Sequence, residues 1–193
     1  MENIILKRFK ESSEVKTRFL KENLSKLLDL IKLIAQTFEA GNKIFFFGNG
    51  GSAADAQHLA AEFVNRYVID RPPLPAIALT TDTSILTSIS NDFAFNEIFA
   101  KQLRAIGKEG DVAIGISTSG NSSNVVKAFE VAKEMGIKTV ALSGNDGGVL
   151  AKMADVSLVV SSTSTPRIQE THILIGHILC EMVEHQLFFK VSP

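Results

Sequence analysis

Two stretches of the chain carry polar side chains at helical spacing, in positions where they could act together. His58 and Glu62 are four residues apart, so both side chains would lie on one face of a helix. Such a pair could bind a metal ion, serve as an acid–base couple, or form a contact on the protein surface. Gln169 and His177 are eight residues apart, about 80° around an ideal helix, and could also line one face.

The remaining histidines of the second stretch are predicted to lie elsewhere. His172 would be about 140° around the helix axis from His177, so the two cannot point toward one ligand set. His185 follows about two turns after His177, near the end of the chain, and is predicted to be structural. Gln169 and His177 are therefore the candidates of this stretch.

A third group of candidates is a run rich in hydroxyl side chains at residues 117–123, which follows an apolar run at residues 112–116. The apolar run predicts a buried strand, and the residues after 123 predict a helix. Backbone N–H groups at the helix start and the neighbouring hydroxyls could bind a phosphate, while Gly120 would let the backbone turn tightly. The same residues could instead cap the helix. The loop has no lysine, so it is not a nucleotide P-loop.

A glycine-rich turn offers a second set of free backbone N–H groups. Residues 48–53, Gly-Asn-Gly-Gly-Ser-Ala, connect a predicted strand at 43–47 to a predicted helix from about 53 to 67. The turn lacks the full spacing of a dinucleotide-binding fingerprint, so it is a weak signal by itself.

These stretches belong to an alternating series of predicted strands and helices. Apolar runs predict five strands, at residues 43–47, 76–79, 112–116, 138–142 and 156–160. Helical patterns between them, and a last helix at about 168–189, predict a doubly wound α/β fold whose parallel sheet is covered on both faces. Residues 91–96 are predicted to form a loop. Ligands bind beyond the carboxyl ends of the strands in such folds, so the glycine turn and the hydroxyl loop should share one crevice.

The elements that position these candidates include a long helix at the start of the chain. Residues 4–40 carry apolar side chains at helical spacing, with lysines and glutamates between them. The pattern predicts one amphipathic helix, or two with a break near Ser12 and Ser13, ended by Gly41. The helix is long for a domain of this size, so residues 1–40 are predicted to bind a partner subunit. The alternative is that it packs entirely on its own sheet.

The composition of the whole chain limits the classes of function. With 193 residues, 45% of them hydrophobic, the chain is long enough for one domain, residues 1–193, with its α/β core at residues 41–193. The net charge of −1 gives no basic surface for nucleic acid or for an anionic membrane. A single cysteine, the absence of a membrane-length apolar run and the absence of a signal-peptide core favour a cytoplasmic protein.

Three motifs together resemble the phosphoheptose isomerases of the sugar isomerase, or SIS, fold. They are the glycine turn and its helix, Phe47–His58 followed by Glu62; the hydroxyl loop, Ile116–Ser122; and the last-helix motif, Arg167–His177. The resemblance extends over essentially the whole chain. It implies one SIS domain with a five-stranded parallel sheet and a long N-terminal bundle helix. It also implies a homotetramer whose sites take residues from neighbouring subunits.

The resemblance implies roles for individual residues. It implies one zinc ion per subunit, bound by His58, Glu62, Gln169 and His177, with Glu62 and His177 as the acid–base catalysts. The implied substrate-binding residues are Asn49, Gly50, Gly51, Ser52, Glu62, Asn91, Asp92, Ser117, Thr118, Ser119, Ser122 and Gln169.

The implied reaction converts sedoheptulose 7-phosphate to D-glycero-D-manno-heptose 7-phosphate through an enediol, in heptose biosynthesis. A carboxylate such as Glu62 can move a proton between two carbons, and an imidazole such as His177 can exchange an oxygen-bound proton near neutral pH. A zinc ion can polarise the carbonyl group. The heptose could serve the lipopolysaccharide core, a surface glycan or a soluble nucleotide-heptose signal.

Two other functions remain open at this point. Some SIS proteins that resemble these isomerases act without catalysis, as factors that associate with a replication initiator or as phosphosugar sensors. Others isomerise a different sugar phosphate, such as arabinose 5-phosphate. The complete set of His58, Glu62, Gln169 and His177 favours an enzyme over a binding protein, and the heptose isomerase motifs argue against another sugar.

Overall fold

The apolar runs of the sequence form one parallel sheet in the computed structural model, which describes residues 1–189. Its strands are β1 (Ile44–Gly48), β2 (Ala76–Ala78), β3 (Val112–Ser117), β4 (Lys138–Gly144) and β5 (Val156–Val160). All neighbouring pairs are parallel, and the strand order is β2-β1-β3-β4-β5. The predicted doubly wound fold with a five-stranded parallel sheet is confirmed.

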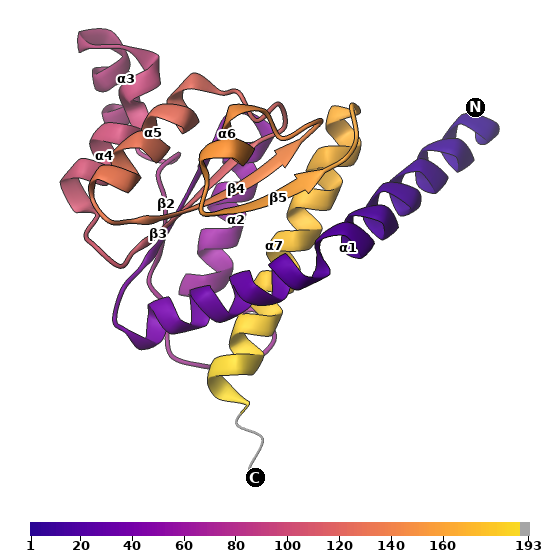
Figure 1. Cartoon of the computed structure of the whole chain (residues 1–193), viewed down its shortest axis with the longest axis horizontal. Helices are drawn as coiled ribbons and strands as arrows, with labels where there is room; N and C mark the ends of the chain where they lie inside the picture. The colour runs from indigo at the N-terminus through magenta and orange to yellow at the C-terminus, as the bar shows by residue number, and fades with distance from the viewer. Residues whose placement is uncertain (190–193) are drawn as a thin grey trace.

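Helices cover both faces of this sheet (Figure 1). In chain order they are α1 (Glu2–Glu39), α2 (Gly51–Val64), α3 (Thr83–Asp92), the 3-10 helix η1 (Phe95–Glu97), α4 (Ile98–Ile106), α5 (Ser123–Glu134), α6 (Gly148–Met153) and α7 (Thr165–Phe188). Helices α1, α2 and α7 pack on one face, around Phe46 and Ile114, while α3 to α6 pack on the other, around Phe45 and Ala113. Successive strand residues point to opposite faces, so covering both faces requires the continuous apolar runs seen in the sequence.

The switch point of the sheet lies between β1 and β3. The chain goes from β1 to β2 on one side and from β3 to β4 on the other. β1 and β3 are hydrogen-bonded neighbours, in register up to the pair Gly48 and Ile116. The glycine turn after Gly48 and the hydroxyl loop after Ser117 therefore leave the sheet side by side, as predicted for a ligand-binding edge.

Helix α1 is a single unbroken helix, which confirms the prediction of one helix, and the alternative of a break near Ser12 and Ser13 is wrong. The Ser12 hydroxyl donates to the Glu170 carboxylate on α7 at 2.7 Å, so it does not compete for the backbone of its own helix. From Val15 onward α1 packs on α7 and β5. Residues 2–10 are exposed and extend past the rest of the molecule (Figure 1). The large apolar side chains exposed there are Ile4, Ile5, Leu6 and Phe9.

Two other predicted boundaries are wrong. Residues 91–96 are not one loop, because Asn91 and Asp92 form the last turn of α3 and only residues 93 and 94 separate it from η1. The Asn91 amide donates to the Asp92 carboxylate at 2.8 Å, so these side chains pair with each other rather than with the backbone of α3. Helix α2 ends at Val64 rather than near residue 67, because the backbone after it turns toward a side chain of α7.

A buried histidine ties α7 to the end of β4. The His172 side chain is buried, and its Nε2 lies 3.1 Å from the carbonyl oxygen of Ser143. Burial lowers the pKa of His172 from 6.5 to about 4, so the ring is neutral in the folded protein near pH 7. His172 and His177 thus contact different parts of the molecule, as their spacing predicts.

Acidification is expected to destabilise the fold through His172. Because its folded pKa lies below its unfolded pKa, the unfolded chain binds the proton more readily between pH 6.5 and about 4. The free energy of unfolding should fall across that range by up to about 3 kcal/mol, while the contribution is fully present above pH 6.5. His172→Gln keeps a donor for Ser143 but cannot be protonated, so denaturant unfolding should show a shallower decline. Equal declines for the variant and the wild type would contradict this assignment.

No helix within residues 1–189 is both long enough and apolar enough to cross a membrane.

Candidate active site

Helices α2 and α7 lie side by side and run in the same direction (Figure 1). The two helices contact each other at three levels. Gly51 faces Gln169 at the first level, and His58 faces His177 at the second. The loop after α2 reaches Glu184 at the third level. At the level of His58 and His177, Gly176 lets the helices approach closely: a methyl group added there would lie 3.0 Å or less from three atoms of Leu59. The predicted groups of the two sequence stretches are therefore brought together by this helix pair.

At the second level of the helix pair, three of the predicted residues lie close to one another. The Nε2 atoms of His58 and His177 are 2.9 Å apart, and the Glu62 Oε1 atom is 3.4 Å from the Nε2 of His58. The ring of Tyr67 stacks on the His177 ring at 5.7 Å between centroids. The side chains of His58 and Glu62 are 48% and 25% exposed, so a ligand can reach this group from solvent.

The donor set of His58, Glu62 and His177 suits a zinc ion, because imidazole nitrogens and carboxylate oxygens are ordinary zinc ligands. Two imidazole nitrogens on one tetrahedral zinc ion would lie about 3.3 Å apart, which is close to the 2.9 Å between these two rings. Within the described residues, however, no three His, Cys, Asp or Glu side chains have the arrangement of a formed metal site. Small rotations of the rings would be needed, and the zinc site stays a prediction.

The fourth predicted ligand, Gln169, lies at the first level of the helix pair. A methyl group added to Gly51 would lie 2.5 Å from the Gln169 Nε2 atom, so the amide sits against the glycine turn. Gln169 and His177 are two turns apart, about 12 Å along α7. The structure therefore brings His58, Glu62 and His177 into contact and holds Gln169 beside the predicted substrate-binding backbone at Gly51.

The hydroxyl loop is ordered by its own side chains. The Ser117 and Ser122 Oγ atoms are 2.8 Å apart, and the N–H of Asn121 donates to the Ser119 Oγ at 3.2 Å. Ser122 is the N-cap residue of α5, but its hydroxyl makes no capping hydrogen bond. This arrangement favours the phosphate-binding interpretation over simple capping, because the first N–H groups of α5 are not used by the cap side chain.

Gly120 fixes the path of this loop. Its φ angle is +67°, and a methyl group added there would overlap the carbonyl oxygen of Gly147. The loop therefore passes directly against the backbone that leads into α6, and only glycine allows this approach.

The glycine turn and the hydroxyl loop are linked by two asparagines. The side-chain amides of Asn49 and Asn124 exchange hydrogen bonds of 2.9 and 2.8 Å across the switch point. Ser52, on the first turn of α2, is buried. The two predicted substrate-binding loops thus form one connected edge, as their placement in the sequence predicts.

Asn91 and Asp92 lie apart from this edge. They are exposed at the end of α3, and the hydrogen bond between their side chains is the interaction that joins them. In the described part of this chain, no hydrogen bond or ion pair connects either side chain to His58, Glu62, His177 or the hydroxyl loop.

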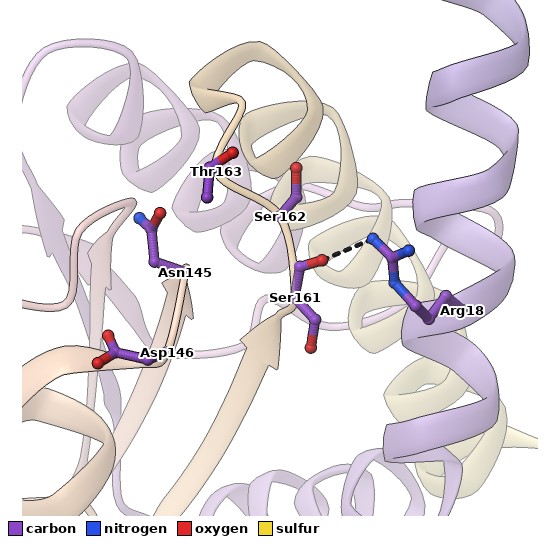
Figure 2. Close-up of a pocket in the computed structure, with 6 residues that line it drawn as sticks. All are labelled: Arg18, Asn145, Asp146, Ser161, Ser162 and Thr163. Carbon is purple, nitrogen blue, oxygen red and sulfur yellow. Dashed lines mark hydrogen bonds between the residues drawn. The ribbon is translucent and has the colours of Figure 1, made fainter.

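A polar pocket of about 620 Å³ opens beside the hydroxyl loop, at the carboxyl ends of β4 and β5 (Figure 2). Arg18 reaches it from α1 and donates to the carbonyl oxygen of Ser161 at 2.6 Å. The Asn145 amide donates to the carbonyl oxygen of Thr118 at 3.1 Å, so one wall of the pocket supports the hydroxyl loop. Its lining is completed by Asp146, Ser162 and Thr163.

Sequence reasoning missed several polar residues around the helix pair. Asp55 is one turn before His58, and burial raises its pKa, an effect that the nearby His58 opposes. Arg71 and Glu184 form a buried ion pair next to Tyr67. Glu184 is seven residues after His177, about two turns along the same face of α7, and this spacing was the one available signal.

Comparisons with known proteins agree with this architecture. The model of the SIS domain family matches residues 8–144. The phosphoheptose isomerase of Thermodesulfovibrio yellowstonii is 54% identical over 188 residues, covering 97% of this chain and 94% of the relative.

Two solved structures are also similar over nearly the whole chain. The phosphoheptose isomerase GmhA of Neisseria gonorrhoeae has a TM-score of 0.89 at 44% identity, covering 95% of this chain and 98% of that one. A phosphoheptose isomerase of Francisella tularensis has a TM-score of 0.91 at 37% identity, with coverages of 95% and 97%.

Proposed function

The chain belongs to the phosphoheptose isomerase family of SIS-domain proteins, and we propose that it converts sedoheptulose 7-phosphate to D-glycero-D-manno-heptose 7-phosphate in heptose biosynthesis. It is an isomerase, and its relatives do not favour the alternative of a non-catalytic SIS protein. The observation that carries the proposal is the contact of His58, Glu62 and His177 at one solvent-accessible place, because a binding protein needs no such acid–base group.

The hydroxyl loop would hold the phosphate of the substrate. Two observations support this role. The first N–H groups of α5 are not bonded by a cap side chain, and the loop carries the hydroxyl groups of Ser117, Thr118, Ser119 and Ser122. The glycine turn, with Asn49, Gly50, Gly51 and Ser52, lies beside it and would bind the sugar chain together with Gln169. Fixing the phosphate at one end positions the reacting carbons for proton transfer at the other.

Glu62 and His177 would move the two protons of the reaction. Glu62 would take the proton from C1 and return it to C2, because a partly buried carboxylate can act as a base toward carbon. His177 would exchange the proton of the neighbouring oxygen, with its ring held between Tyr67 and His58.

His58, Glu62, His177 and Gln169 would hold one zinc ion, which when bound would polarise the carbonyl group of the substrate. The support is the chemistry of the donor set and the contact among three of its members. Gln169, at the neighbouring level of the helix pair, would complete the set after a change of its side-chain conformation.

A homotetramer would complete the site. Two features support assembly: the exposed apolar side chains on residues 2–10 of α1, and the exposed position of Asn91 and Asp92 at the end of α3. Neighbouring subunits would cover the first and bring the second to the substrate of another chain.

The direct test of the proposed function is a product assay. Purified protein should convert sedoheptulose 7-phosphate to an aldoheptose phosphate, and a zinc chelator should suppress this conversion. Ribulose 5-phosphate, the ketose partner of arabinose 5-phosphate, serves as the competing substrate. Conversion of that pentose alone would replace the proposed substrate by another sugar phosphate.

Removal of one loop hydroxyl is expected to weaken substrate binding. Ser119→Ala should raise KM for the phosphorylated substrate by roughly 10- to 100-fold, because a hydrogen bond to a charged group contributes about 1.5–3 kcal/mol. Steady-state kinetics and competition by inorganic phosphate measure the effect. Ser88→Ala, an exposed serine on α3 whose hydroxyl bonds within its own helix, is the control. Unchanged KM and unchanged phosphate competition in Ser119→Ala would move the phosphate site elsewhere.

A further inference from the structure

A buried ion pair joins the end of α2 to α7, one level beyond the candidate catalytic residues. The Nε of Arg71 is 3.0 Å from the Glu184 Oε1, and both side chains are 1% exposed. The Glu184 carboxylate also accepts the backbone N–H groups of Tyr67, Val68 and Ile69, at 2.7, 2.9 and 3.3 Å. One carboxylate on α7 therefore binds three consecutive backbone N–H groups of the loop that follows α2.

The other half of the pair holds the last turn of α2. The Arg71 guanidinium donates to the carbonyl oxygen of Phe63 at 2.6 Å and to that of Glu62 at 3.0 Å. Carbonyl groups in the last turn of a helix have no partner within the helix, so Arg71 fulfils a capping role there. One of the two carbonyls belongs to Glu62, the proposed base.

Both candidate catalytic residues, Glu62 and His177, are therefore connected to the same ion pair. Arg71 binds the backbone of Glu62, and Glu184 binds the backbone of Tyr67, whose ring stacks on His177. Glu184 itself is on α7, about two turns after His177. The pair thus contacts the backbone of Glu62 directly and the His177 ring through Tyr67.

We propose that the Arg71–Glu184 pair is a positioning device for the proposed isomerase site, holding Glu62 and His177 in register across the α2–α7 interface. This inference rests on the proposed function. The pair stabilises the fold by satisfying backbone groups at the end of α2 and in the loop after it. The same contacts fix the register of the two helices, and a displacement of about 1 Å at reacting groups can cost on the order of a hundredfold in rate.

The contacts of the pair require both the guanidinium group of Arg71 and the ionised carboxylate of Glu184. Arg71 uses the planar fork of its guanidinium to bind Glu184 and two carbonyl groups at once, which the single ammonium group of lysine cannot reproduce. Burial alone would raise the pKa of Glu184, but the three backbone N–H donors and Arg71 lower it below its ordinary value, so the carboxylate stays ionised.

The first test compares Arg71→Lys and Glu184→Gln with the wild-type protein. Each variant should lower kcat by on the order of tenfold or more, and leave KM for sedoheptulose 7-phosphate within about twofold, because the hydroxyl loop does not contact the pair. Asp111→Asn is the matched control. Asp111 is a buried carboxylate that accepts two backbone N–H groups and pairs with Lys43, at the opposite ends of β1 and β3. It should lower thermal stability but leave kcat near the wild-type value.

A second readout does not depend on turnover. The visible spectrum of Co²⁺ added to the metal-free protein reports the arrangement of its ligands. Both variants should change this spectrum, while Asp111→Asn should leave it as in the wild type. If either variant fails to fold, Glu184→Asp keeps the negative charge but shortens the reach of the carboxylate, and should fold yet remain slow.

The inference is overturned if stably folded variants of the pair keep the wild-type kcat and the wild-type Co²⁺ spectrum. The pair would then only stabilise the fold, as Asp111 does. This outcome is distinct from failure of the proposed function, in which the wild-type protein itself would not convert sedoheptulose 7-phosphate.

Discussion

Glu62→Gln is expected to bind the sugar phosphate almost normally and to lose turnover by on the order of a hundredfold or more. The substitution keeps the size of the side chain and one oxygen, but removes the basic carboxylate that is proposed to move the proton between C1 and C2. Steady-state kinetics with sedoheptulose 7-phosphate measure the loss. KM should change little, because the phosphate is proposed to bind the hydroxyl loop rather than α2.

The alternatives to Glu62 as the base are less well placed. Asp92 lies exposed at the end of α3 and pairs with Asn91. Glu170 binds the Ser12 hydroxyl and Arg167. Glu130→Gln is a suitable control, because this glutamate lies on α5, on the opposite face of the sheet, and pairs with Lys127. A Glu62→Gln enzyme with wild-type kcat would assign the base to another residue.

His58→Ala is expected to lose bound zinc and most of the activity while keeping its fold. The His58 side chain is 48% exposed, so its removal leaves no cavity in the core. It faces both His177 and Glu62, and truncation would remove one of the proposed zinc ligands. The activity should fall by on the order of a hundredfold or more, since loss of even an outer partner of a metal ligand costs about 10–100-fold.

Elemental analysis of the purified variant measures the zinc content directly. His185→Ala is the control, because His185 is exposed near the end of α7 and stacks on Phe189 rather than on the site. This control should bind as much zinc as the wild type. A full zinc content in His58→Ala would remove His58 from the proposed ligand set.

The fold was accessible from the sequence because its strands are short apolar runs with strong turn signals between them. The positions of all five strands and the shared edge of the two loops were predicted correctly. The errors lie where polar residues give local signals that tertiary contacts override. Ser12 is accommodated in α1 by Glu170, and α2 ends at Val64 because Glu184 of α7 binds the backbone that follows it. A prediction made from residue types alone cannot include such partners, because they lie far away in the sequence.

Part of the candidate site could be predicted from the sequence. Helical spacing correctly put His58 and Glu62 on one face and separated His172 from His177. The spacing could not reveal that α2 and α7 run in parallel with Gln169 beside Gly51, because that register depends on close packing at Gly176. Arg71 and Glu184 look like ordinary surface charges in the sequence, and only the folded chain buries them together.

The most direct test of the proposed reaction follows sedoheptulose 7-phosphate with the wild-type protein in deuterated water. Transfer of a proton through an enediol at a solvent-accessible carboxylate predicts an aldoheptose phosphate that carries deuterium at C2, visible by NMR as the loss of the C2 proton signal. Zinc-loaded, folded protein that forms no aldoheptose phosphate under these conditions would contradict the proposed function.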